Sequence, residues 1–315
     1  MAGADITIAA GTRAAAVEAT IAAGTRAAGE RRLRPYLWFI WPALIVSSAV
    51  IIFPWLFTIW MSLNDWHIGS KQVFVGLDNY TSLATDRRFL ESIGHTIYFT
   101  ILAVALPMVL GTLAALVFHK KFRGRGFFRT IFIMPMMATP VAVALIWAMM
   151  FHPQLGVLNY LLSTVGLPPS QWVFATSTVI PSLVLVEVWL WTPFVMIIVL
   201  GGLASLPTEP YEAALIDGAN QWQMFWKITY PLVLPFLVVA LIMRTIDALK
   251  VFETIWAICN GGPGTASEVL NVYLYAQAFA YNQVGTASAV VVVYFAIIVA
   301  LSLVLLWARQ KANWS

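Results

Sequence analysis

Four ionisable residues recur at every third position within one long apolar stretch of the sequence: Arg244, Asp247, Lys250 and Glu253. At the centre of a membrane such side chains cost about 2.5–3.5 kcal/mol each on insertion scales, so they tend to mark functional positions. The spacing places Arg244 and Asp247 on one face of a helix, with the other two drifting around it. The alternative is a structural ion pair, either between these two side chains or with a partner protein.

The sequence contains no motif for nucleotide or metal catalysis. A Gly-x4-Gly-Lys-Ser/Thr loop is absent, so the chain cannot bind ATP by that means, and there is no His-Glu-x-x-His motif. Gly124-Arg-Gly126 lacks the third glycine of a dinucleotide site. Cys259 is the single cysteine, which excludes an internal disulfide, and we expect it to be a small packing residue. We therefore expect no bound cofactor and no enzymatic activity of the chain on its own, so that energy comes from partners. The four histidines lie near the ends of apolar stretches, where an interfacial role is expected: His67, His95, His119 and His152.

The elements that position these residues are membrane spans. Hydrophobic residues make up 61% of the 315 residues and charged residues only 10%, and the mean hydropathy is +0.83. Each charge-free stretch is long enough for a spanning helix of about 20 residues, and none alternates as a β-barrel strand would. The sequence predicts an all-α integral membrane protein of about six spans. We expect them at 37–63, 96–118, 130–151, 178–201, 230–258 and 286–308.

Charge distribution predicts the topology and the domains. Five Arg residues precede the first span, and five Lys and Arg residues lie within 120–129. Loops rich in Lys and Arg stay in the cytoplasm, so both termini are expected there; the basic loop could instead hold acidic lipid headgroups or a partner. The first apolar stretch is too long for a cleaved signal. We expect a low-complexity cytoplasmic tail at 1–35, a transmembrane domain at 36–309 and a cytoplasmic tail at 310–315.

One loop, at 206–231 between the fourth and fifth expected spans, differs from the others. Thr208 and Pro210 suit a helix start, and Gly218 interrupts the helix. A second short helix follows, with Trp222 and Trp226 four residues apart on one face, and Pro231 is expected to close it. Such a rigid knob could insert into a groove on another protein. Equally, the two helices could lie along the membrane surface with their Trp side chains at the interface.

This loop resembles the EAA loop of permeases from bacterial ABC importers, whose pattern is Glu-Ala-Ala-x3-Gly-x9-Ile-x-Leu-Pro. Tyr230 stands where the pattern has Leu, which is a conservative apolar change. The resemblance implies the ABC importer permease fold, and that the loop is a coupling helix which docks in a cleft of a separate ATP-hydrolysing subunit. The matching positions are Glu212, Ala213, Ala214, Gly218, Ile228 and Pro231, and we add Asp217 and Trp222 as coupling candidates.

Three further motifs narrow the class to carbohydrate-uptake ABC permeases. Phe74-Val-Gly-Leu-Asp-Asn-Tyr80 is similar to their outer-loop motif, Arg125-Gly-Phe-Phe-Arg129 before Met134-Pro135 to their third-span entry, and Asn260-Gly-Gly-Pro263 to their Gly-Gly-Pro turn. The resemblance covers about 36–309. It implies a heterodimer with a second similar permease, two copies of an ATP-binding subunit that holds ATP and Mg, an extracytoplasmic sugar-binding protein, and a place in the bacterial inner membrane.

The resemblance also implies that the stretch before the Gly-Gly-Pro turn lines the solute path. Contact with a polyhydroxyl solute and a structural ion pair are then the two interpretations of the charged residues. Two cations also suit an anionic sugar derivative, although the carboxylates cancel much of their charge. Trp189 and Trp191, close to Glu187 in the sequence, could stack on a sugar or anchor the span at the interface. The candidate path residues are Arg244, Asp247, Ala248, Val251, Glu187 and Trp189.

Three other interpretations stay open. An ion-coupled secondary transporter would bind its ion at acids such as Glu187, but inverted repeats are not visible and the EAA loop argues against it. A structural anchor for a cytoplasmic complex would explain the knob but not the charged fifth span. An ABC permease for a non-sugar solute would share every feature except the substrate.

Overall fold

A computed structural model describes residues 38–311 of the chain, so the expected N-terminal tail and most of the expected C-terminal tail lie outside the described residues. The described part contains five helices long and apolar enough to span a membrane. A bent helix pair supplies a sixth span if it is counted as one. The five are Trp38–Ser62, Arg87–His119, Val179–Ala204, Gln221–Leu249 and Val284–Trp307. The predicted all-α membrane fold is confirmed, while the side of the membrane on which the termini lie stays a prediction.

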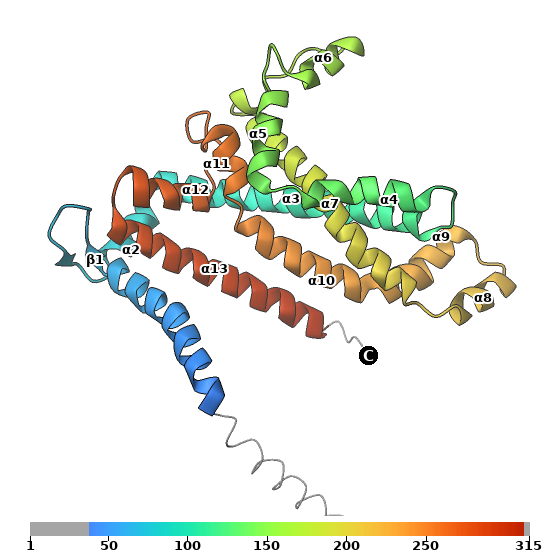
Figure 1. Cartoon of the computed structure of the whole chain (residues 1–315), viewed down its shortest axis with the longest axis horizontal. Coiled ribbons are helices and arrows are strands. Elements are labelled where there is room, and N and C mark those ends of the chain that lie inside the picture. Colours follow the sequence, from blue (N-terminus) through green and yellow to red (C-terminus); the bar gives the residue numbers. More distant parts are fainter. Residues whose placement is uncertain (1–37, 312–315) are drawn as a thin grey trace, which may run out of the picture. The chain divides into compact units, whose positions relative to one another are not determined.

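The chain divides into two compact units, residues 1–58 and residues 59–315. The first contributes most of the helix Trp38–Ser62, whose apolar side chains are largely exposed. The second holds all the remaining elements and the core (Figure 1). Its spanning helices are α3 (Arg87–His119), α7 (Val179–Ala204), α10 (Tyr230–Leu249) and α13 (Val284–Lys311).

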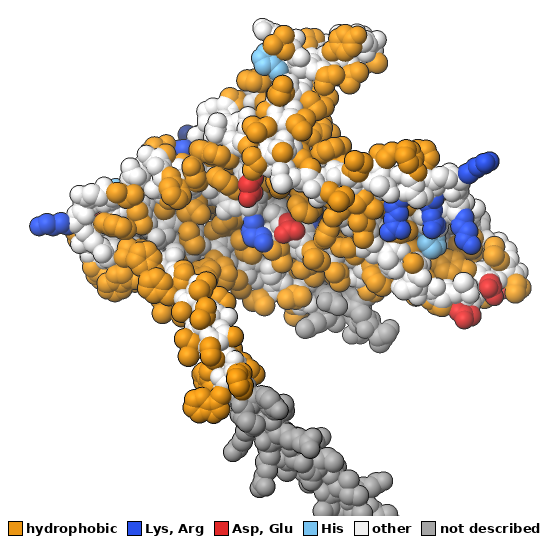
Figure 2. All heavy atoms as spheres, viewed as in Figure 1, with side chains coloured by type: hydrophobic (Ala, Val, Ile, Leu, Met, Phe, Trp, Pro, Cys, Tyr) orange, Lys and Arg blue, Asp and Glu red, His pale blue; other side chains and the backbone are white. Residues whose placement is uncertain are grey.

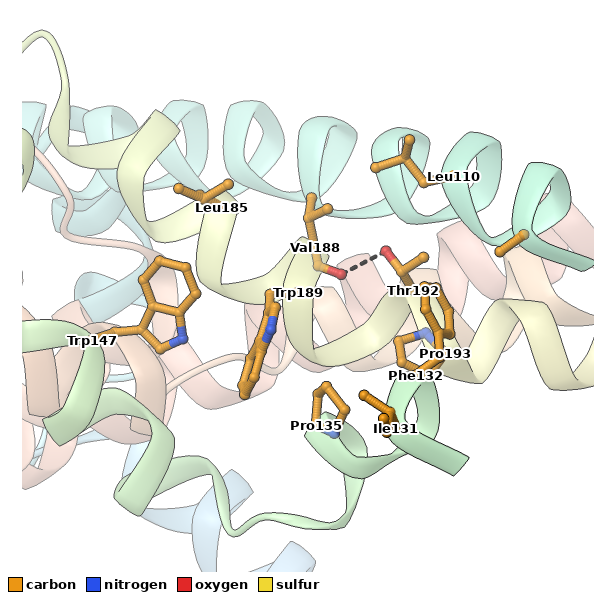
Figure 3. Close-up of a pocket in the computed structure, with 11 residues that line it drawn as sticks. Leu110, Ile131, Phe132, Pro135, Trp147, Leu185, Val188, Trp189, Thr192 and Pro193 are labelled. Atoms are coloured by element: carbon orange, nitrogen blue, oxygen red, sulfur yellow. Dashed lines mark hydrogen bonds between the residues drawn. The ribbon is translucent and has the colours of Figure 1, made fainter. Parts of the chain in front are cut away.

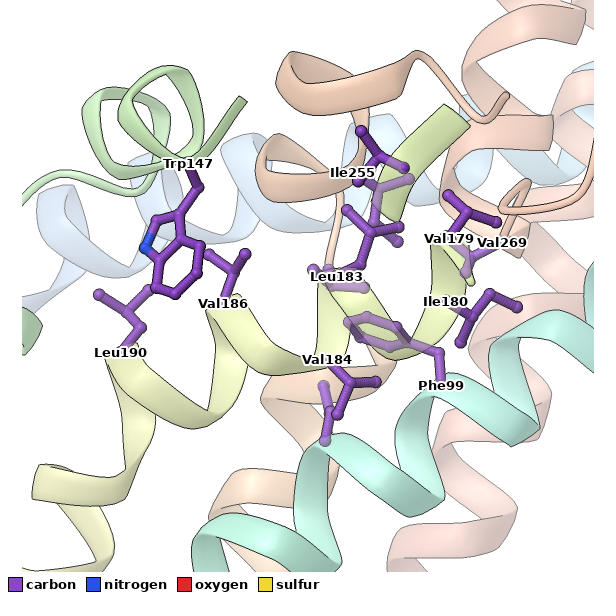
Figure 4. Packing of buried hydrophobic residues seen from close by; sticks show 14 of the residues in the cluster. Phe99, Trp147, Val179, Ile180, Leu183, Val184, Val186, Leu190, Ile255 and Val269 are labelled. Carbon is purple, nitrogen blue, oxygen red and sulfur yellow. The ribbon is translucent and has the colours of Figure 1, made fainter. Parts of the chain in front are cut away.

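Helix α3 packs against α7 to form the centre of the second unit. Phe99 of α3 is fully buried beside Leu183 of α7 and Ile255, in one apolar cluster (Figure 4). Further along, a Cβ on Gly111 would lie 2.6 Å from the Cβ of Val195, so these two helices approach through a glycine. This close approach fixes α7, which carries Glu187.

The third expected span is broken rather than continuous. Helices α4 (Arg125–Ile133) and η1 (Met134–Met137) run into α5 (Pro140–Met150) through a bend of 97°. The prediction of one helix over 130–151 is therefore wrong. Proline lacks the N–H that continues a helical ladder, and it disfavours a helical residue before it, so Pro140 begins a new helix in a new direction.

The fifth expected span is also shorter than predicted. Helix α10 ends at Leu249, and a separate helix α11 (Glu253–Cys259) follows, so the predicted continuous span 230–258 is wrong. The side-chain amide of Asn271 donates to the carbonyl oxygens of Lys250 at 2.7 Å and Val251 at 3.3 Å. It thereby satisfies backbone groups that the break exposes.

An ion pair fixes the segment that follows α11 (Glu253–Cys259) to the start of α3. Arg88 Nε donates to the buried carboxylate of Glu268 at 2.6 Å. The Tyr273 hydroxyl donates to Asp86 at 2.5 Å, and burial and then this hydrogen bond raise the pKa of Tyr273. Asp86 also caps α3 by accepting from the Arg88 amide, so the helix begins nine residues before the predicted span at 96.

The remaining elements are short. A hairpin of β1 (Asn64–Asp65) and β2 (Val73–Phe74) is antiparallel, with Asn64 paired to Phe74. The other helices are α2 (Asp78–Thr85), α6 (Val157–Thr164), η2 (Trp172–Phe174), α8 (Glu209–Ile216), α9 (Gln221–Met224), η3 (Phe225–Thr229), α12 (Leu270–Tyr275) and η4 (Ala276–Ala280). Figure 2 shows apolar side chains over most of the visible surface, as expected for a protein surrounded by lipid.

Candidate functional site

The 206–231 loop turns a corner at Gly218, which has a φ of +75°. Helix α8 ends in a Schellman arrangement, because the Ala219 amide donates to Ala214 O at 2.9 Å and the Gly218 amide to Leu215 O at 3.2 Å. Only glycine adopts this left-handed backbone without strain. The predicted interruption at Gly218 is confirmed. Thr208 occupies the N-cap position, but its side chain makes no capping hydrogen bond.

A capping box starts the next helix two residues later. The Asn220 side chain accepts from the Gln223 amide, and the Gln223 side chain accepts from the Asn220 amide, both at 2.9 Å. The helix then continues without interruption from Gln221 to Leu249. The prediction that Pro231 closes a short helix is therefore wrong. A π-helical turn, η3, precedes Pro231 and accommodates the residue that cannot donate a backbone hydrogen bond.

The outer surface of this loop is apolar and exposed. Ile216 is 88% exposed and Trp222 70% exposed. Trp222 and Trp226 lie on one face, with ring centroids 5.6 Å apart, as predicted. Glu212 and Asp217 are exposed on the neighbouring helix α8 and its end.

A hollow of about 430 Å³ lies inside the corner. It brings together four of the coupling candidates predicted from the sequence, whereas the other four lie outside it. Its lining residues are Ala214, Asp217, Gly218, Ala219, Gln223, Met224, Lys227 and Ile228. The sequence analysis missed Gln223 and Lys227, although the Asn-x-x-Gln spacing of the capping box was visible.

The basic loop that follows α3 lies beside this region. His119 and Lys120 line a second hollow together with Tyr211 of α8 and Gln221 of α9. Several Lys and Arg side chains gather at the end of the molecule that carries α4, α8 and α9 (Figures 1 and 2). Two loops that the sequence assigns to the same side of the membrane are therefore neighbours in space.

The charged residues meet at the other end of α10, in a cavity of about 220 Å³. Arg244 is only 1% exposed and donates a hydrogen bond to the buried carboxylate of Glu187 on α7. Thr254 of α11 donates to the second oxygen of that carboxylate at 3.1 Å. The guanidinium also lies over the Trp191 ring, with Cζ 4.9 Å from its centroid. The ion pair thus joins α7 to α10, and the Thr254 hydrogen bond adds α11.

A second, weaker pair lies at the rim of the same cavity. Asp247 lies 3.8 Å from Lys250 Nζ, and both side chains are more than one-third exposed. The two face-sharing residues of the sequence analysis, Arg244 and Asp247, therefore do not pair with each other. Glu253 completes the charged lining as the first residue of α11. With all five side chains ionised, two cations and three carboxylates leave this cavity with one net negative charge.

Comparison with known proteins assigns the chain to a family. The family model described as the binding-protein-dependent transport system inner membrane component matches residues 107–312. The chain belongs to this family. It is thus a permease subunit without enzymatic activity of its own, and it crosses the cytoplasmic membrane several times.

Several relatives and one solved structure cover nearly all of the permease. A probable ABC transporter permease protein of Sinorhizobium fredii is 35% identical over 279 residues, which are 88% of this chain and 90% of the relative. A trehalose/maltose transport system permease protein of Thermococcus litoralis is 35% identical over 85% of this chain and 90% of that protein. A chain from the crystal structure of a bacterial alginate ABC transporter superposes with a TM-score of 0.79 at 22% identity, over 90% of this chain and 97% of that chain.

Not every predicted path residue of the permease reaches the charged cavity. Glu187, Arg244, Asp247 and Val251 line it, but Ala248 is fully buried in the apolar core. Trp189 points away, into an apolar cavity of about 560 Å³, where its ring lies 5.9 Å from that of Trp147 (Figure 3). Neither Ala248 nor Trp189 is therefore in place to contact a solute in the charged cavity.

The sequence analysis of the permease named Trp191 beside Glu187 but missed three other residues of this cavity: Leu190, Thr254 and Pro140. Leu190 follows Glu187 by three residues, so helical spacing could have placed both on one face. Thr254 and Pro140 could not be found in this way, because the breaks before α11 and α5 bring them to the cavity.

Proposed function

We propose that the permease imports a sugar or sugar derivative together with a second, similar but non-identical permease subunit. Two copies of an ATP-binding subunit and an extracytoplasmic binding protein complete the proposed assembly. Relatives named for trehalose/maltose transport and for transport of starch degradation products support the substrate class. The alginate transporter, which was solved with a substrate-bound periplasmic protein, supports the binding-protein partner.

The loop 206–231 is proposed to receive the force of ATP hydrolysis from the ATP-binding subunit, which holds ATP and Mg. The observation that carries this proposal is a rigid corner with exposed apolar side chains, built by the residues of the EAA pattern around Gly218. A large apolar side chain on a rigid helix is the kind of anchor that partner proteins bury in a pocket. Ile216 and Trp222 fit that role.

The permease links this loop to the charged cavity through a single helix. Gln221–Leu249 is continuous, so Trp222 and Arg244 belong to one rod and lie about 33 Å apart along its axis. A displacement of the loop is proposed to move α10 against α7 and α11 at the Glu187–Arg244 pair. Alternating access then follows if the pair holds the two helices differently in the outward-open and inward-open states.

The charged cavity is the proposed contribution of the permease to the solute path. Its net charge favours a neutral polyhydroxyl solute over an anionic derivative, because both cations already face carboxylates. Hydroxyl groups can both donate and accept, so they can bind to ion-paired side chains without separating the charges. Trp191 offers an aromatic plane on the same wall.

The experiment that tests this function uses the transporter reconstituted in vesicles with its binding protein. Glu212→Lys reverses a charge within the EAA pattern, and Glu209→Lys makes the same change at an exposed acid of the same helix outside the pattern. Glu212→Lys is expected to abolish ATP-driven sugar uptake while the protein stays inserted, and Glu209→Lys to retain most of it. Uptake that continues in Glu212→Lys, or without ATP, would contradict the proposal.

A further inference from the structure

The segment between α5 and α7 carries the short helix α6 (Val157–Thr164) away from the bundle, as Figure 1 shows. From residue 130 to residue 186 the sequence contains no Asp, Glu, Lys or Arg. Large apolar side chains cover this segment on the outside. Those exposed are Leu155, Val157, Tyr160, Leu161, Val165, Leu167 and Phe174.

Helix α6 buries one polar side chain and exposes large apolar ones. Its one buried side chain is polar, because Asn159 is only 6% exposed, whereas Tyr160 and Leu161 point outward and are 68% and 53% exposed. Leu158 and Leu162 are half-buried on the inner side, and the other large apolar side chains of the helix face outward. This exposed apolar surface indicates an apolar environment around the helix.

Asn159 is held by four hydrogen bonds. Its amide donates to Pro153 O at 2.7 Å and to Ser170 O at 2.9 Å. Its carbonyl oxygen accepts from the Ser170 amide at 3.0 Å and from the Trp172 indole at 2.8 Å. The segment is therefore a rigid unit with a satisfied polar interior.

The hydroxyl groups on α6 also bond within the helix. Ser163 donates to Tyr160 O and Thr164 donates to Leu161 O, both at 2.7 Å. Apart from the Tyr160 hydroxyl, the polar side chains of α6 therefore bond internally, as contact with hydrocarbon requires. An interface with a protein partner usually contains about one hydrogen bond per 100–200 Å². This face of α6 presents few free donors for such bonds.

We propose that α6 is an interfacial helix that lies in the lipid leaflet opposite the 206–231 loop. The exposed apolar surface continues from the α5 side chains Leu145 and Met149, so one lipid-facing surface runs from α5 to α6. The segment directly precedes α7, and the far end of α7 leads to the loop, which places α6 at the opposite leaflet. The Tyr160 hydroxyl then reaches the headgroups while the ring stays in the apolar region. Helix α6 would hold the bent α5 at a fixed depth in the membrane.

The test places one fluorescent label on α6 in the intact transporter in lipid nanodiscs. Cys259→Ala removes the natural thiol, whose pKa burial raises and which the proposed function does not use. Leu161→Cys then carries the environment-sensitive dye NBD, and Tyr160→Cys is a second position on the same face. Gln72→Cys, in the exposed hairpin loop, is the matched control, and unlabelled Cys259→Ala gives the background.

Two quenchers distinguish lipid from water. Quenching by phosphatidylcholine with a doxyl group near the headgroup is expected to exceed quenching by aqueous iodide about threefold at residue 161, as for a helix that lies at the headgroup boundary. The ratio is expected to reverse at residue 72. Iodide quenching at 161 equal to that at 72 would overturn the proposal in favour of water exposure. Protection from both quenchers at 160 and 161 would overturn it in favour of a protein contact.

Discussion

The two ends of the continuous helix Gln221–Leu249 are built in different ways. The loop end is specified locally, because the glycine corner and the capping box use residues within a few positions of one another. The cavity end depends on pairing over distance, since Glu187 and Arg244 are 57 positions apart and come from different helices. Local geometry makes the loop a rigid surface for a partner, whereas the long-range pair makes the cavity a joint between helices. Substitutions can therefore change the partner-binding loop and the ion pair at the cavity separately.

The largest effect on stability is expected from removing the Glu187–Arg244 ion pair. Glu187→Ala leaves Arg244 buried without its counter-charge, which typically costs about 3–5 kcal/mol. The variant is expected to unfold at a clearly lower temperature in detergent, as measured by thermal denaturation. Replacing both partners, as Glu187→Leu with Arg244→Met, is expected to recover most of that loss because no unpaired charge remains. A single variant as stable as the wild type would show that the pair does not join the helices.

A substitution at Gly218 is expected to lower stability less than Glu187→Ala does, but to reduce the coupling of ATP hydrolysis to uptake more. Gly218→Val forces a β-branched residue into the left-handed region, at a cost of about 1–2 kcal/mol. No atom lies within 4 Å of the added Cβ, so the strain is confined to the backbone. We expect ATP hydrolysis to continue while uptake per ATP falls sharply. Gly218→Asn, which tolerates this conformation better, should retain more coupling, and equal coupling in both variants would contradict the role of the corner.

The smallest effect separates the two tryptophans of α7. Trp191→Leu removes the cation–π contact with Arg244, worth about 0.5–2 kcal/mol, and one wall of the charged cavity. Trp189→Leu alters only the apolar cavity beside Trp147. We expect the first variant to raise the KM for uptake and the second to leave it unchanged. The opposite order would place the solute path in the apolar cavity.

The same contrast between local and distant contacts explains what the sequence could predict. The membrane fold and the Gly218 corner follow from apolar stretches and a local motif. Two features that the sequence analysis missed do have local signals. Pro140 marks the break of the third span, and the spacing of Asn220 and Gln223 marks a capping box. The continuation of the helix through Pro231 depends on a π-helical turn, which has no clear signal in the sequence.

The partner of Arg244 was beyond local reasoning. Its helix offered Asp247 at the right spacing, whereas the actual partner, Glu187, comes from α7. The buried site of Arg244 is created by the packing of α7, α10 and α11, which no periodicity reveals. The only available sign was that both residues are ionisable and lie in apolar stretches.

The central claim is that the exposed corner of the loop meets an ATP-hydrolysing subunit. The most direct measurement is photo-cross-linking from a benzophenone amino acid at Ile216, which is 88% exposed, in the intact transporter in membranes. The predicted result is a covalent adduct with the ATP-binding subunit, identified by mass spectrometry and lost in Glu212→Lys. An adduct with lipid alone, in membranes where the transporter imports its substrate, would contradict the claim.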